Sequence, residues 1–217
     1  MGYSLPPSVT FCWVGSVPYF LDLKADRYFK LAGRSAEQFR ALIAGDEIAQ
    51  ADAADLEAAG AIVCINTALS AFVAPLSRRF TRSIVEEASS SITLSSLSRA
   101  IFDTCRTSFA LRSRSLSSVV DQLMAAKTLA CGEVGLDHIE MVASTYRTLD
   151  FLVSSETRCL ARSIAMARTL LTEGNNFELI LGVRSGPFGA HCWLAQGDVV
   201  LNDRLDKVRD FTPILVI

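Results

Sequence analysis

The chain has 217 residues, of which half are hydrophobic, and a formal net charge of −2 at neutral pH. This length suffices for one large domain or two small ones with buried cores, and the near-neutral balance argues against nucleic acid as a partner. The six cysteines include no Cys-x-x-Cys pair, and no signal-peptide pattern opens the chain. We therefore expect a reduced, cytoplasmic protein without a disulfide or zinc framework.

The first third of the sequence predicts a small domain. Short segments rich in aromatic and β-branched residues predict strands over 9–13, 19–23 and 27–31, with a turn at 24–26. Helical patterns follow over 36–44 with Ser35 as the cap, over a short piece at 46–50, and over 52–59 before Gly60. Three strands followed by three helices indicate a winged-helix-like domain over residues 1–66.

Residues 58–77 contain no charged side chain and are long enough to cross a membrane. Gly60, Asn66 and Pro75 interrupt the segment, and its composition is rich in alanine rather than leucine. We therefore expect no membrane span, but the end of one element followed by a buried helix over 68–80 that Pro75 kinks or ends.

The middle of the chain is predicted to be helical. Residues 67–98, which include a serine-rich run over 83–98, are expected to form a helical linker to a domain over 99–217. Apolar residues then recur at helical spacing in three sets. The sets are Leu97, Ile101, Cys105 and Phe109; Leu116, Val119, Val120 and Leu123; and Ile139, Val142, Tyr146 and Leu149.

A candidate nucleophile, Cys159, opens the next helical pattern. Ser154, Ser155 or Thr157 can cap this helix, and Gly174 is expected to close it. A thiol at a helix N-terminus faces unpaired N–H groups and the positive end of the helix dipole, which favour the reactive thiolate.

Three short apolar segments follow, over 177–183, 191–195 and 199–203, and they predict strands. A three-residue loop at 196–198 pairs Ala195 with Val199 and places His191 opposite Asp203, whereas a two-residue loop shifts the register and loses that pair. Cys159, His191 and Asp203 would then supply nucleophile, general base and orienting carboxylate. Asp198, Asp206 and Asn202 remain alternative orienting groups.

Other candidates favour structural roles. Cys192 follows His191 on the same strand, so its side chain points to the opposite face, which is typical of a buried thiol. His138 opens a helix next to Asp137, which favours a partly exposed histidine at the start of that helix. Arg106, Arg112 and Arg114 form no stripe interleaved with aromatic residues, which favours a solvated helix face over nucleic-acid binding. No metal site is expected.

Several blocks of the C-terminal sequence together resemble the B protein of lasso-peptide biosynthesis. They are Arg-Cys-Leu-Ala-Arg-Ser-Ile-Ala over 158–165, Leu-Ile-Leu-Gly-Val-Arg over 179–184 with Pro187 and Phe188, Ala-His-Cys-Trp over 190–193, and Val-Leu-Asn-Asp over 200–203. The blocks occur in the family's order, and Cys159, His191 and Asp203 fit its catalytic positions. The resemblance is sharp from about residue 145 to the end and looser before it.

The resemblance implies a transglutaminase-like cysteine peptidase that removes the leader from a ribosomally made precursor. It further implies that residues 1–66 are a precursor recognition element, on which the leader adds as a strand beside the third strand and lies against the third helix. Expected leader contacts are Tyr28, Phe29, Lys30, Leu31, Asp55, Leu56 and Ala59; for Phe29 and Leu31, a purely core role is the stronger interpretation.

The expected fold is α+β, with the winged-helix-like domain followed by a papain- or transglutaminase-like domain in which a catalytic helix packs on an antiparallel sheet. The family's further partner is an asparagine-synthetase-like macrolactam cyclase that uses ATP. No cofactor is expected on this chain itself, since no phosphate-binding glycine loop is visible, although ATP dependence through the cyclase fits the family. Two alternatives remain open: a leader-binding adaptor without activity, and an enzyme that transfers the acyl group to an amine.

Overall fold

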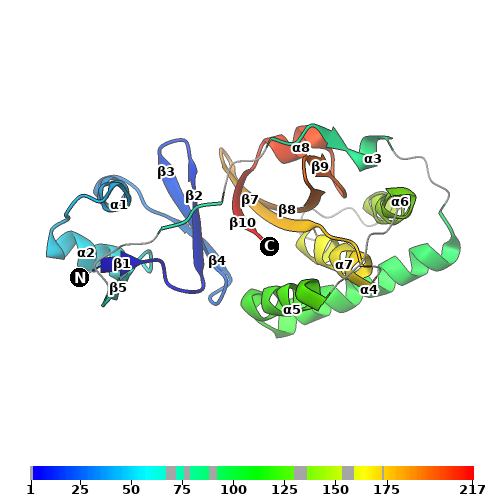
Figure 1. The fold of residues 1–217 in the computed structure, drawn as a ribbon, viewed down its shortest axis with the longest axis horizontal. Coiled ribbons are helices and arrows are strands. Elements are labelled where there is room, and N and C mark those ends of the chain that lie inside the picture. The colour runs from blue at the N-terminus through cyan, green and yellow to red at the C-terminus, as the bar shows by residue number, and fades with distance from the viewer. Residues whose placement is uncertain are drawn as a thin grey trace. The chain divides into compact units, whose positions relative to one another are not determined.

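The computed structural model of the protein describes residues 2–66, 72–75, 79–87, 92–129, 136–152, 159–172 and 174–217. The chain divides into two compact units, Met1–Leu76 and Ser77–Ile217, and each combines strands with helices. The expected α+β class is therefore confirmed, with a strand-rich region followed by helices in the first unit and an antiparallel-rich sheet with helices in the second (Figure 1).

The first unit contains an antiparallel sheet in the order β2-β3-β4. These strands are β2 (Val9–Val14), β3 (Val17–Asp22) and β4 (Arg27–Lys30), which match the three predicted strands to within a few residues. The turn between β3 and β4 forms because the Asp22 Oδ1 atom accepts hydrogen bonds from the N–H groups of Lys24 (3.0 Å) and Ala25 (3.1 Å). Since β3 pairs on both sides, β4 lies at an edge of this sheet.

Two helices follow the sheet, α1 (Arg34–Ala44) and α2 (Gln50–Ala58). The expected cap is wrong, because Ser35 lies inside α1 and Gly33 precedes the helix. The expected helical piece at 46–50 is also wrong: Gly45 ends α1 in the left-handed conformation, and the chain then runs in irregular and extended conformation to Ala49. A short antiparallel pair, β1 (Gly2–Ser4) with β5 (Val63–Ile65), completes the unit.

Aromatic side chains dominate the core of the first unit. Phe20 is fully buried on the central strand, and its ring lies 5.0 Å from Phe39 of α1 and 4.8 Å from Phe29 of β4. Leu56 of α2 closes the core from the second helix. This packing explains why a short segment with so few helical turns holds a defined fold.

The expected helix at 68–80 falls partly outside the described residues, and residues 72–75 and 79–80 are not helical. Within the expected linker, β6 (Arg82–Ser83) and α3 (Ile84–Glu87) belong to the second unit, where β6 pairs with β9 (Val199–Val200). Across the described ranges, none of the helices has the length and hydropathy needed to cross a bilayer.

The second unit is built on a five-stranded sheet in the order β10-β7-β8-β9-β6. The long central strands are β7 (Glu178–Ser185) and β8 (Phe188–Gln196), and β10 (Thr212–Val216) lies beside β7. All neighbours are antiparallel except β6 and β9, which run parallel. A short helix, α8 (Leu205–Arg209), connects β9 to β10 and buries Val208 against Trp193 and Val200.

Four longer helices complete this unit (Figure 1): α4 (Leu94–Ser113), α5 (Leu116–Leu129), α6 (Leu136–Leu152) and α7 (Cys159–Thr172). Helix α7 packs on β8 and also contacts α4 and α6. The predicted apolar sets of α5 and α6 are buried, as expected. The prediction for α4 is wrong in part, because Ile101, Cys105 and Phe109 are exposed while Ala100 and Thr107 face the core. Small residues allow α4 to approach α7 closely.

Candidate active site

Helix α7 presents Cys159 at its first residue. The helix is buried nearly all round by small and apolar side chains, among them Ala161, Ile164 and Ala165, so tertiary packing rather than amphipathicity holds it in place. It ends as predicted near Gly174, which adopts the left-handed conformation and donates its N–H to the carbonyl of Leu171. The expected capping residues 154, 155 and 157 lie outside the described residues.

The strand register that we expected is wrong, although the residues it was meant to bring together do meet. The loop between β8 and β9 has two residues, so Ala195 pairs with Val200 and Gln196 with Val199. Continued along the chain, this register would set Asp203 opposite Cys192, on the face away from His191. However, β9 ends at Val200, and the chain bends over residues 201–203. The bend brings the Asp203 carboxylate within 2.6 Å of His191 Nε2.

The Asp203 carboxylate is held from three sides. Besides His191, its Oδ2 atom accepts from Lys207 Nζ at 3.1 Å, and its Oδ1 atom accepts from the N–H of Arg204 at 2.8 Å. The hydroxyl of Ser83, on β6, donates to the Asp203 carbonyl at 2.6 Å. These contacts fix the bend that ends β9, and they give β6 a structural part in the site.

The second nitrogen of His191 faces the thiol. Because Nε2 binds Asp203, Nδ1 remains for the hydrogen bond between the imidazole and the Cys159 sulfur. That sulfur also accepts hydrogen bonds from the backbone N–H groups of Cys192 and Leu160. The structure thus brings Cys159, His191 and Asp203 together in series, with His191 and Asp203 both buried and Cys159 half-buried.

The two reactive groups influence one another's protonation. Burial would raise the pKa of the Cys159 thiol, but the hydrogen bond and charge of His191 and the two backbone N–H groups lower the pKa below its ordinary value of 9.0. Burial would lower the pKa of His191, but Asp203 and the thiol raise the pKa above 6.5. Both shifts favour a thiolate beside an imidazolium, the reactive state of a cysteine nucleophile.

The Asp203 carboxylate stays ionised at neutral and mildly acidic pH. Burial would raise its pKa, yet the hydrogen bond and charge of His191, the charge of Lys207 and the N–H of Arg204 lower the pKa to about 2, from an ordinary value of 3.8. A carboxyl group whose pKa is lowered in the folded protein stabilises the fold at pH values above its ordinary pKa. For Asp203 this contribution is about 2 kcal/mol. This contribution is lost as the pH falls from 3.8 towards 2.

Aromatic rings pack around the imidazole. The ring of His191 lies 5.1 Å from Phe211 and 6.0 Å from Trp193, which is itself fully buried. Trp193 lies over Gly182 of β7, where a Cβ atom would come within 2.7 Å of two atoms of the indole and 3.0 Å of Phe211 Cβ. Gly182 therefore provides the space that lets both rings pack against His191.

We expect Gly182→Ala to displace Trp193, destabilise the protein by about 1–3 kcal/mol and, by shifting His191, lower the reactivity of the Cys159 thiol. Thermal unfolding would measure the first effect, and the rate of alkylation of the Cys159 thiol would measure the second. Gly189→Ala on β8 is the matched control, because its nearest neighbour is the flexible side chain of Arg184 and a smaller effect on both is expected. Equal effects at the two glycines would contradict the role given to Trp193.

The structure separates the alternative orienting groups from the imidazole. Asp206 is exposed and pairs with Arg204 at 2.9 Å, and Asp198 accepts a hydrogen bond from Thr81. Cys192 has a fully buried side chain, and burial raises the pKa of its thiol well above 9.0. Asn202 is buried beside Asp203, but it binds other partners than His191.

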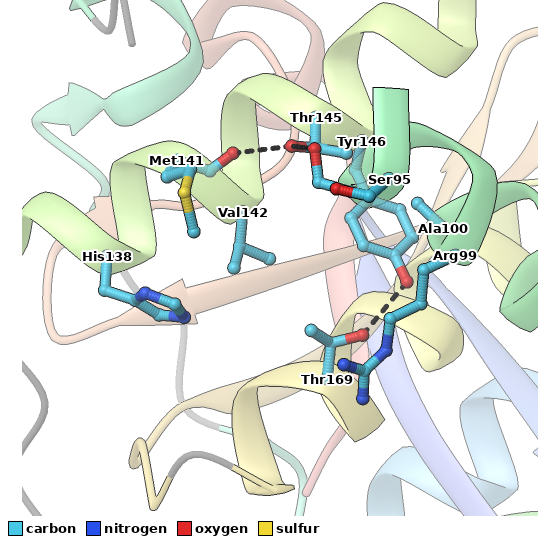
Figure 2. A pocket seen from close by; sticks show the side chains of 10 residues that line it. Ser95, Arg99, Ala100, His138, Met141, Val142, Thr145, Tyr146 and Thr169 are labelled. Carbon is cyan, nitrogen blue, oxygen red and sulfur yellow. Dashed lines mark hydrogen bonds between the residues drawn. The ribbon is translucent and has the colours of Figure 1, made fainter. Parts of the chain in front are cut away.

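His138 lies apart from the triad, half-buried near the start of α6. It lines a cavity of about 340 Å³ between α4, α6 and α7 (Figure 2). Hydroxyl groups line this cavity, among them those of Tyr146 and Thr169, which are hydrogen-bonded to each other at 3.1 Å. None of the three triad residues lines it. Within the described residues, no group of three potential metal ligands is found.

The residues expected to bind a leader lie in the first unit and differ in exposure. Leu31 and Leu56 are buried in its core, and Phe29 packs against that core. Lys30 and Asp55 are exposed. Tyr28 and Ala59, the remaining two, are half-buried.

Sequence reasoning missed several supporting residues. Lys207 and Ser83 contact Asp203, and Ser163 of α7 binds both β8 and Asn202. Ser163 follows Cys159 by one helical turn, and Lys207, on α8, follows Asp203 by four residues. This spacing could have been recognised in the sequence as one that brings side chains together. The contact from β6 had no local signal, because it joins residues 120 positions apart.

A helix-borne thiol, a strand-borne imidazole and a carboxylate in series define the cysteine–histidine–acid class of site. A family model described as transglutaminase-like superfamily matches residues 104–216, which include all three residues, and the chain belongs to this superfamily. No curated protein and no solved structure matches the chain.

Proposed function

We propose that the protein is the leader peptidase of lasso-peptide maturation, which hydrolyses the bond between leader and core of a ribosomally made precursor. The observation that carries the proposal is the serial contact of Cys159, His191 and Asp203 in a transglutaminase-like domain. The sequence blocks around these residues, which resemble the lasso-peptide B protein, support the choice of substrate.

The proposed reaction begins with attack of the Cys159 thiolate on the carbonyl carbon of the last leader residue. The imidazolium of His191 gives its proton to the departing amine, so the core peptide leaves with a free N-terminus and the leader remains as a thioester. His191 then removes a proton from water, which attacks the thioester and releases the leader as a carboxylic acid. Asp203 stabilises the imidazolium and holds its orientation throughout.

Backbone donors are available for the oxyanion that forms at the carbonyl. We expect the N–H of Cys159 to be one donor. The N–H of Cys192 points at the Cys159 sulfur, and we propose it as the second donor, which the sequence alone did not identify. Because Cys192 directly follows His191, the same strand would position both the oxyanion donor and the general base.

The leader is proposed to add to the outer edge of β4, the last strand of the sheet β2-β3-β4. The backbone N–H and C=O groups of residues 27, 29 and 31 point toward β3 in the antiparallel ladder. The hydrogen bond from the Leu31 N–H to the Pro18 carbonyl (3.2 Å) indicates this. The N–H and C=O groups of Tyr28 and Lys30 therefore point to the opposite edge. An extended leader would pair with these two residues through its backbone.

Side chains of the recognition element would then choose the leader sequence. Lys30 and Asp55 are exposed and offer charges of opposite sign, and Tyr28 offers an aromatic surface. Phe29, Leu31 and Leu56 would act indirectly, by supporting β4 and α2 from the core. Docking on this element would raise the effective concentration of the scissile bond at the peptidase site.

We expect Tyr28→Pro to weaken leader binding by tenfold or more. Proline removes an N–H that faces away from β3, so the edge strand can keep its ladder while it loses a bond to the leader. Tyr28→Ala is the matched control, since it removes the side chain and keeps the N–H. Fluorescence anisotropy with a labelled leader would measure both. Equal binding by Tyr28→Pro and the unmodified protein would contradict strand addition at β4.

The product is proposed to pass to an asparagine-synthetase-like macrolactam cyclase, which would account for any dependence of the reaction on ATP. This chain is proposed to work in the cytoplasm, where the precursor is made. The cyclase consumes the new N-terminus, so cleavage must come before ring closure.

The direct test is to incubate the purified protein with a lasso-peptide precursor, with and without the cyclase and ATP. Mass spectrometry should find the leader and the core as separate fragments. In water enriched in ¹⁸O, the leader should gain one heavy oxygen. Incorporation of an added amine instead would show acyl transfer, and binding of the precursor without cleavage under any condition would show an adaptor.

A further inference from the structure

The backbone of Cys192 contacts two successive turns of α7. Its N–H donates to the sulfur of Cys159, and its C=O accepts from the Ser163 hydroxyl at 2.9 Å. Both groups point to the same edge of β8, as the N–H and C=O of one strand residue do. At this point α7 takes the place of the neighbouring strand, because the β8–β9 ladder begins only at Ala195.

Asn202 fills the gap between α7 and β9. Its Oδ1 atom accepts from the N–H of Leu194 at 2.8 Å, and its Nδ2 atom donates to Ser163 Oγ at 2.8 Å. The Leu194 carbonyl accepts from the N–H of Leu201 at 2.9 Å. The backbone groups on this edge of β8 therefore have three successive partners: β9 binds those of Gln196, residues 201–202 bind those of Leu194, and α7 binds those of Cys192.

The directions of these hydrogen bonds follow from the groups involved. Ser163 has a single O–H, which it gives to the Cys192 carbonyl, so it can only accept from Asn202. The amide of Asn202 must then turn its oxygen to Leu194. Ser163 is fully buried and Asn202 is 4% exposed, so neither can replace a lost partner with bulk water. The three hydrogen bonds are therefore consistent with one another.

Each residue of the network adjoins one of the triad. Cys192 follows His191, Asn202 precedes Asp203, and Ser163 lies one helical turn beyond Cys159. The network joins the three chain segments that carry the nucleophile, the base and the orienting carboxylate. We propose that Ser163 and Asn202 are positioning residues that hold the Cys159 thiolate against His191. This inference rests on the triad of the proposed function.

The proposal predicts a chemical defect in Ser163→Ala and Asn202→Ala. Without the hydroxyl or the amide, α7 can shift relative to β8, and displacements of about 1 Å in such sites cost on the order of 10²-fold in rate. A weaker contact with His191 returns the thiol towards its ordinary acidity. We expect alkylation of Cys159 by iodoacetamide near pH 6 to slow about tenfold, its pH midpoint to rise, and kcat to fall more than KM changes.

Ser144→Ala provides the matched control. Ser144 is a buried serine of α6 in the same unit, and its hydroxyl has no hydrogen-bond partner among the described residues. Its loss removes the same atoms from a buried site without touching the network. Alkylation is followed at Cys159 by peptide mass spectrometry, because Cys64 and Cys105 are exposed and will react too. All variants are compared at a temperature where thermal unfolding shows them folded.

The outcomes separate this inference from the proposed function. A raised pH midpoint in both network variants, with Ser144→Ala unchanged, supports the positioning role even if the unmodified protein cleaves no precursor. A lower melting temperature with an unchanged midpoint in the network variants overturns it, even if cleavage occurs. Should Ser163→Ala fail to fold, Asn202→Ala alone decides, since it leaves α7 unaltered.

Discussion

Replacement of Cys159 by alanine is expected to lower precursor cleavage by at least about 10³-fold while precursor binding is unchanged. The Cys159 thiol is hydrogen-bonded to the imidazole of His191, whereas the adjacent Cys192 is buried and burial raises the pKa of its thiol. Cys159 is half-buried at the end of a helix, so its loss leaves the packing of α7 intact. Single-turnover cleavage and leader binding, measured in parallel, would test both parts.

Cys105→Ala is the control for the loss of a thiol. Cys105 is exposed on α4 in the same unit, and its removal should alter neither cleavage nor binding. Cleavage by Cys159→Ala at a tenth or more of the original rate would refute the assignment of the nucleophile. Loss of cleavage together with loss of leader binding would instead indicate damage beyond the active site.

The histidine–aspartate pair shows both the reach and the limit of reasoning from the sequence. The residue types at 191 and 203 were predictable, because strand patterns and a preceding helix-borne cysteine indicated a triad. The geometry was not predictable, because the ladder rule applies only while the strand continues. Here β9 ends at Val200, and the bend that follows depends on contacts of Asp203 with Ser83 and Lys207.

Helical periodicity was equally informative in two helices and misleading in a third. The apolar sets of α5 and α6 are buried, but Ile101 and Phe109 of α4 are exposed. The buried face of α4 carries Ala100 and Thr107 instead, because it packs closely against α7. A hydrophobic stripe identifies a helix, but close packing of neighbouring helices decides which face turns inward.

The Asp203 carboxylate should account for a second large effect. We expect Asp203→Asn to reduce kcat/KM by about 10²- to 10⁴-fold, since the imidazolium loses its compensating charge and the ring its fixed orientation. Without the carboxylate, burial dominates, so the pKa of His191 falls and, with the imidazolium less populated, the pKa of the Cys159 thiol rises. The variant also loses about 2 kcal/mol of stability at neutral pH, so rates must be compared below its melting temperature.

The pH profile distinguishes this chemical role from a loss of packing. In the unmodified protein, cleavage should rise with pH as the thiol ionises below 9.0 and fall as the imidazolium loses its proton above 6.5. In Asp203→Asn the acid limb should move to higher pH and the alkaline limb to lower pH, which narrows the active range. Asp206→Asn, an exposed carboxylate three residues away that pairs with Arg204, should leave both limbs in place. A profile that narrows in Asp206→Asn but not in Asp203→Asn would mean that the bend after β9 presents the wrong carboxylate to the imidazole.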